Sequence, residues 1–108
     1  MTRLAAAGVP ILAGSDAGNP DVYRGPGLLH ELEALVRAGL KPADALRAAT
    51  GAAGRALGLP SGRLASGAAA DFVIVGANPT ADVRNLRAIR AVVLRGRLFT
   101  TDELLASR

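Results

Sequence analysis

The chain has 108 residues, the size of one small domain, and half of them are hydrophobic while only 20% are charged. This composition excludes an intrinsically disordered chain, and the absence of cysteine excludes disulfides, thiolate metal sites and thiol catalysis. A net charge of +4 invites a nucleic-acid interpretation, but the arginines are dispersed and aromatic residues make up only 3% of the chain. A stacking platform for bases is therefore excluded.

The sequence also gives expectations about location. It contains no apolar run that approaches the ~20 residues required by a membrane-spanning helix. Its first eight residues are too short and too interrupted for a signal peptide. We therefore expect a cytoplasmic protein that has neither a membrane nor a nucleic acid as its partner.

The first predicted elements are the end of a helix and a strand. Residues 2–7 have helical character, and Gly8 provides a left-handed stop. Residues 9–13 form a continuous apolar run, the pattern of a parallel strand that is buried on both faces. Ser15 and Asp16 therefore follow the carboxyl end of the predicted strand.

A loop and a long helix come next. Residues 17–27 are predicted as a loop because they contain Asn-Pro and Gly-Pro-Gly. From residue 28 leucines recur on one helical face, and Gly39 ends the helix. On this helix Glu33 and Arg37 have the spacing of a stabilising i,i+4 ion pair.

The pattern changes near residue 60. Before this point two shorter helices are predicted, one with Pro42 at its first position and a weaker one that closes at Gly58. After it the sequence has strand character at residues 71–75 and 88–100. The second of these ranges contains Arg95-Gly96, which fits a two-residue hairpin turn.

Three stretches together resemble a known family. They are GVPILAGSDAG at residues 8–18, LLHELEALVRAGLKPADALRAATGAAGRALGL at 28–59, and GRLASGAAADFVIVGANPTADVRNLRAIRAVVLRGR at 62–97. In order and spacing they resemble the C-terminal third of the metal-dependent amidohydrolase superfamily, in its imidazolonepropionase-like and prolidase-like branch. The resemblance implies an α/β fold class, namely a C-terminal fragment of a (β/α)8 TIM-type barrel followed by strands of a small composite β-sandwich.

The same resemblance implies a division of the chain. Residues 1–59 would hold the last barrel strand, formed by residues 9–13, the active-site loop and the following helices. Residues 60–100 would be the β-sandwich portion. Residues 101–108 would be a C-terminal tail.

Asp16 is the candidate catalytic and metal-binding residue. On the residues alone, a turn or helix-cap aspartate is the favoured explanation. The resemblance instead aligns Asp16 with the family's aspartate after the last barrel strand, which binds a divalent metal such as zinc and transfers a proton. Its place at the carboxyl end of a barrel strand agrees with that role.

The resemblance further implies a reaction and an incomplete site. A metal-activated water would hydrolyse the C–N bond of a small non-peptide, cyclic or dipeptide-like amide. The family's other metal ligands, a His-x-His pair, a carboxylated lysine or glutamate and further histidines, have no counterpart in these 108 residues. We therefore predict that the chain alone is inactive, binds no metal tightly, and associates with itself or with a missing N-terminal portion. The alternatives are a non-catalytic α/β remnant or assembly module, and a basic nucleic-acid-binding protein.

Three further residues are candidates for substrate binding. Tyr23 and Arg24 lie in the predicted loop, and His30 follows it. Loops at this face of a barrel shape the substrate pocket, although ordinary exposed polarity explains the same residues. His30-Glu31 begins the H-E-x-x-H metal motif, but residue 34 is alanine. His30 is therefore not predicted as a metal ligand.

Overall fold

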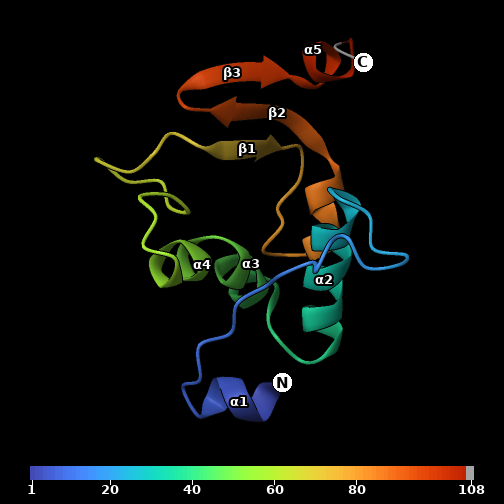
Figure 1. The fold of residues 1–108 in the computed structure, drawn as a ribbon, viewed down its shortest axis with the longest axis vertical. Helices are drawn as coiled ribbons and strands as arrows, with labels where there is room; N and C mark the ends of the chain where they lie inside the picture. Colours follow the sequence, from blue (N-terminus) through green and yellow to red (C-terminus); the bar gives the residue numbers. More distant parts are fainter. Residues whose placement is uncertain (107–108) are drawn as a thin grey trace.

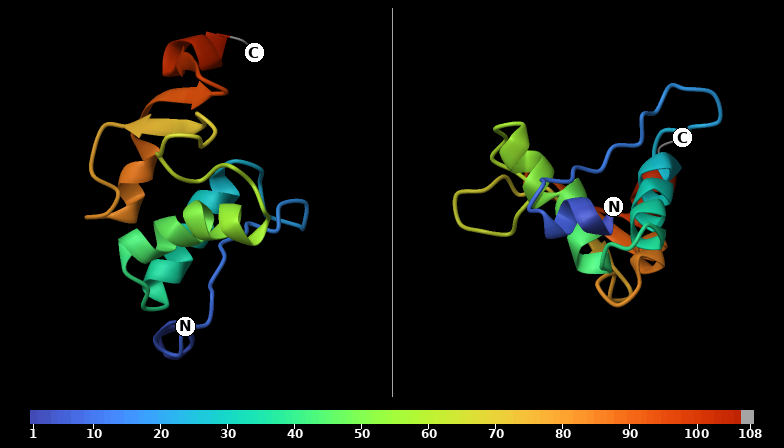
Figure 2. Two further views of the ribbon diagram at one scale, coloured as in Figure 1. Left: turned by 90° about the vertical axis from the view of Figure 1, so that its left-hand side faces the viewer. Right: turned by 90° about the horizontal axis from the view of Figure 1, so that it is seen from below.

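The computed structural model describes residues 1–106, and its helices and strands form two regions. Figure 1 shows a small sheet at one end of the molecule, a central group of helices, and the first helix at the opposite end; Figure 2 gives the same arrangement from two further directions. No helix within these residues has the length and apolar character needed to cross a membrane. The elements are α1 (Thr2–Ala6), α2 (Pro26–Arg37), α3 (Pro42–Ala49), α4 (Gly51–Ala56), β1 (Phe72–Val75), the 3₁₀ helix η1 (Val83–Arg87), β2 (Ile89–Leu94), β3 (Arg97–Thr100) and α5 (Thr101–Ala106).

The main core lies between α2, α3 and η1. The leucines of α2 recur every three or four residues, so they lie on one face of the helix. Leu32 and Leu35 are only 2% and 4% exposed, and they belong to one apolar cluster with Ala45 and Ala48 of α3 and Val83 of η1. The predicted leucine face of the helix is therefore confirmed.

The predicted helices are present with small differences at their ends. Helix α2 begins at Pro26 rather than at residue 28, because the fixed φ of proline suits the first helical position. Helix α3 begins at Pro42 as predicted. Gly8 and Gly58, which follow α1 and α4, have φ of +74° and +66°, as expected for left-handed helix stops.

The sheet has three antiparallel strands in the order β1-β2-β3. β2 and β3 form a hairpin whose turn is Arg95-Gly96, with φ of 51° and 78°. Both residues have positive φ, which matches the right-handed twist of the strands. Asp71 Oδ1 accepts a hydrogen bond of 2.6 Å from the Arg95 backbone N–H and fixes this turn next to β1. The strands predicted at residues 71–75 and 88–100 are confirmed.

The strand predicted at residues 9–13 is not present in this structure. The Ala13 N–H donates to the Ala48 carbonyl oxygen of α3, and Ile11 and Ala13 pack against the core. Val9 and Leu12 are each 45% exposed. A strand needs a hydrogen-bonded neighbour, and within residues 1–106 no strand lies beside this segment. The structure therefore shows a mixed α/β fold but not a barrel.

Six residues that were predicted as part of a tail form α5. Thr100 and Glu103 make a capping box, in which the Thr100 N–H donates to Glu103 Oε2 at 2.7 Å and the Glu103 N–H donates to Thr100 Oγ1 at 3.3 Å. The Thr100 backbone N–H and hydroxyl both donate to Glu103 Oε2, and these two bonds hold the pKa of the Glu103 carboxyl below its usual value. Helix α5 contacts β2 and β3. The last two positions of the predicted tail, 107 and 108, lie outside the described residues.

Candidate functional site

Asp16 lies at the end of the segment that follows α1, in a tight turn. Its φ is +52°, an uncommon value for a residue with a side chain, although aspartate tolerates it better than most. Asn19 stabilises this turn, because its side-chain amide donates to the carboxylate of Asp16 and, at 3.2 Å, to its carbonyl oxygen. The Asp16 side chain is exposed. Asp16 therefore lies in a turn that Asn19 stabilises, and its carboxylate is exposed to solvent.

The loop after Asp16 forms one wall of a cavity of about 350 Å³ against α2. Tyr23 from the loop and His30 from α2 both line this cavity, so the structure brings together two of the predicted substrate-binding residues. Arg24 and Asp16 are not among the lining residues. The other polar side chains that line it are Ser15, Asp21, Glu31 and Arg37.

Residues 1–106 do not by themselves fit a metal ion. Within residues 1–106 no three His, Cys, Asp or Glu side chains lie close enough to hold one. The Asp16 carboxylate is hydrogen-bonded to Asn19, and His30 lines a cavity that Asp16 does not line. A protein site for zinc uses three or four protein ligands. One exposed carboxylate therefore cannot form such a site.

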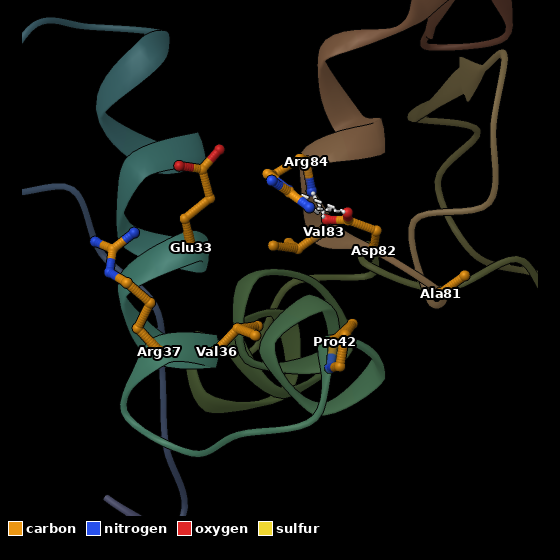
Figure 3. Close-up of a pocket in the computed structure, with 8 residues that line it drawn as sticks. All are labelled: Glu33, Val36, Arg37, Pro42, Ala81, Asp82, Val83 and Arg84. Atoms are coloured by element: carbon orange, nitrogen blue, oxygen red, sulfur yellow. Dashed lines mark hydrogen bonds and ion pairs between the residues drawn. The ribbon is translucent and has the colours of Figure 1, made fainter.

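A second cavity of about 390 Å³ lies between α2 and η1. Figure 3 shows Glu33 and Val36 on α2 and Val83, Asp82 and Arg84 on the opposite side. Asp82 accepts from the backbone N–H of Arg84 at 2.9 Å and pairs with its guanidinium at 2.7 Å, which lowers the pKa of the Asp82 carboxyl. Asp82 thereby caps η1, and its pair with Arg84 lies within η1 and its cap rather than between η1 and α2.

Sequence reasoning missed the ion pair that joins these two elements. Glu33 Oε1 lies 2.7 Å from Arg87 Nη2, so Glu33 bonds to η1 rather than to Arg37 on its own helix. The hydrogen bond from Arg87 lowers the pKa of the Glu33 carboxyl. The two residues are 54 positions apart, and no local pattern relates positions so distant. Arg37 makes no direct ion pair with Glu33 among the described residues, but its charge also contributes to the lowered pKa of the Glu33 carboxyl.

Replacement of Glu33 by glutamine is expected to reduce the loss of stability on acidification. Because the pKa of Glu33 is lower in the folded chain than in the unfolded chain, its pairing stabilises the fold above the unfolded pKa of about 4.3. That contribution is lost as the pH falls through the folded pKa. Thermal unfolding of wild type and Glu33→Gln from about pH 7 to about pH 3 measures it. Glu31→Gln on the same helix is the control, and identical pH profiles for the two variants would contradict the assignment.

Two solved structures are similar to this chain. The chain resembles a β-aspartyl dipeptidase from the thermophilic, keratin-degrading Fervidobacterium islandicum, with a TM-score of 0.69 and 22% identity over 94% of this chain and 26% of that one. It also resembles a crystal structure of an amidohydrolase, with a TM-score of 0.54 and 26% identity over 91% of this chain and 36% of that one. The first of these likenesses supports the fold alone.

The chain thus spans about a quarter of the length of the first structure and about a third of the second. The comparison with curated proteins gives no match. The model of the amidohydrolase family matches residues 1–99, which is nearly the whole chain. The chain therefore belongs to the amidohydrolase family.

Proposed function

We propose that the chain contributes to a metal-dependent hydrolase that cleaves the C–N bond of a small amide. The substrate would be a non-peptide, cyclic or dipeptide-like amide. The observation that carries the proposal is the position of Asp16, which follows the apolar segment 9–13 inside the matched range 1–99. In this proposal residues 1–59 supply the last barrel strand, the active-site loop and the helices, and residues 60–100 supply part of a β-sandwich.

The proposed role of Asp16 is that of one ligand among several in a site for a divalent metal such as zinc. Its carboxylate is exposed and accepts a hydrogen bond from the side-chain amide of Asn19. Tyr23 and His30 would contact the substrate, because they share one cavity beside this turn. Arg24 is a further proposed substrate contact from the same loop, although it does not line that cavity.

The proposal also holds that the remaining metal ligands come from polypeptide outside these 108 residues. The chain contains one histidine and no cysteine, so it cannot supply the several nitrogen or sulfur ligands of a typical zinc site. The chain alone would then be inactive. Its apolar segment 9–13 would become a strand when neighbouring strands are present, because Val9 and Leu12 are exposed here.

Reading the DNA upstream of the Met1 codon in the same frame tests this proposal. We expect a continuous frame that encodes an early His-x-His pair and later histidines. In the protein made from that frame, Asp16→Asn is expected to lower kcat/KM for a small amide by about 10²-fold or more, the usual size of a lost acid–base group. Asp44→Asn is the matched control, because Asp44 is an exposed acid that pairs with Arg47 on α3. An upstream stop codon without such a frame would favour the non-catalytic module instead.

A further inference from the structure

The side chain of Asn19 makes two hydrogen bonds to the same residue. Its amide nitrogen donates to Oδ2 of the Asp16 carboxylate and, at 3.2 Å, to the backbone carbonyl oxygen of Asp16. An asparagine amide carries two hydrogens, so it can serve both acceptors. The bond to the carbonyl oxygen stabilises the turn, as asparagine side chains do elsewhere. The bond to Oδ2 acts instead on the aspartate side chain, and the turn itself does not require it.

The bond to Oδ2 restricts the orientation of the Asp16 carboxylate. Rotation of the carboxylate about its side-chain bonds would move Oδ2 away from Asn19 and break the bond. Among the described residues the structure gives Oδ1 no hydrogen bond or ion pair. An ionised carboxylate accepts several bonds through its two oxygens. One oxygen of Asp16 is therefore bonded within the chain, and the other is open to a further partner.

The backbone that carries Asp16 is held by contacts that do not use the Asn19 side chain. The Ala13 N–H donates to a carbonyl oxygen of α3 at 3.1 Å. Ser15 packs so closely on the first turn of α2 that a Cβ added at Gly27 would lie 3.1 Å from the Cβ of Ser15. Loss of the Asn19 amide would therefore free the carboxylate of Asp16 more than the backbone beside it.

The contact between Asn19 and Asp16 is also local. It joins residues three positions apart, so it does not depend on the polypeptide that would complete the site. Carboxylates that bind metal ions in proteins are themselves hydrogen-bonded to neighbouring groups that orient them, and loss of such a group costs about 10–100-fold in metal affinity or activity. Asn19 has the position and the donor group for this task.

We propose that Asn19 is a positioning residue for Asp16. Its amide keeps Oδ2 bonded within the chain, so that Oδ1 is the oxygen presented to the metal. The inference rests on the proposed function, because Asn19 acts only through Asp16. It adds to that function the group that selects between the two oxygens of the carboxylate.

Steady-state kinetics of the longer protein encoded by the upstream frame test the proposal. Asn19→Ala is expected to lower kcat at least about tenfold. KM is expected to stay unchanged, because the lost contact serves the transition state rather than the binding of substrate. Asn19→Ser keeps a hydroxyl donor of shorter reach, so it is expected to recover part of kcat. Thermal unfolding checks that each variant is folded.

Asn78→Ala is the matched control. Asn78 also stabilises a turn through its side chain, since its Oδ1 accepts from the Thr80 N–H at 2.9 Å. This turn follows β1 and lies outside the proposed site. We expect Asn78→Ala to keep the kcat and KM of the wild type.

Asn19→Asp separates positioning from a purely structural role. Aspartate favours the same turns as asparagine, but its ionised carboxylate only accepts hydrogen bonds. A structural role predicts that this variant keeps the kcat of the wild type. Positioning predicts a loss of kcat at least as large as in Asn19→Ala. If Asn19→Ala does not fold, equal kcat values for Asn19→Ser and Asn19→Asp would overturn the proposal.

The outcomes also distinguish this inference from the proposed function. If Asp16→Asn lowers kcat/KM and a folded Asn19→Ala does not lower kcat, the positioning role is overturned while the proposed function stands. A raised KM with unchanged kcat in Asn19→Ala would equally overturn it. If Asp16→Asn has no effect, or if the upstream frame is closed by a stop codon, the proposed function fails and this inference fails with it.

Discussion

Replacement of Gly62 by alanine is expected to lower the free energy of unfolding by about 2–5 kcal/mol. Gly62 has φ of +84°, where a residue with a side chain is strained. An added Cβ would also overlap the carbonyl oxygen of Thr50. That oxygen accepts the Gly54 N–H at 2.8 Å at the start of α4, so it cannot move away without loss of this bond. Urea denaturation followed by circular dichroism measures the change.

Gly58→Ala is the matched control for Gly62→Ala. Gly58 has φ of +66°, but an added Cβ there would meet nothing within 4 Å. This variant therefore loses only the backbone contribution, roughly 1–2 kcal/mol. The difference between the two variants reports the close approach of the loop at Gly62 to the junction between α3 and α4. Equal losses of stability would contradict that approach.

Local patterns in the sequence predict most of the secondary structure. The leucines of α2 predicted a buried helical face, and Leu32 and Leu35 are buried as expected. Arg95-Gly96 predicted the hairpin turn, because two neighbouring residues with positive φ suit this loop. The capping box at Thr100 and Glu103 is an equally local signal. Helix α5 was therefore within reach of sequence reasoning, although it was missed.

Features that depend on distant neighbours were not predicted correctly. The apolar run at residues 9–13 has the composition of a buried strand, but hydrogen bonds to a neighbouring strand decide whether one forms. Here the segment instead donates from Ala13 to Ala48 of α3. In the same way Glu33 forms its direct ion pair with Arg87 rather than with Arg37, because the fold brings η1 against α2.

The candidate site is predictable only in part, for the same reason. The turn at Asp16 and Asn19 is local, and the loop before α2 lies close to the helix start, so Tyr23 and His30 share a cavity. Their relation to a metal is not local, because it depends on ligands that residues 1–106 do not bring together. Asp16 therefore remains a proposed ligand whose partners are proposed to lie on other polypeptide.

The central claim is that Asp16 can be only one ligand of a metal site whose other ligands lie outside this chain. The zinc content of the purified chain after dialysis tests this claim most directly. One exposed carboxylate provides too few ligands to retain zinc against dialysis, so elemental analysis is expected to find far less than one zinc per chain. Asp16→Asn is expected to give the same value as the wild type. One zinc per wild-type chain that is lost in Asp16→Asn would contradict the account, because it would mean that these 108 residues form a complete metal site.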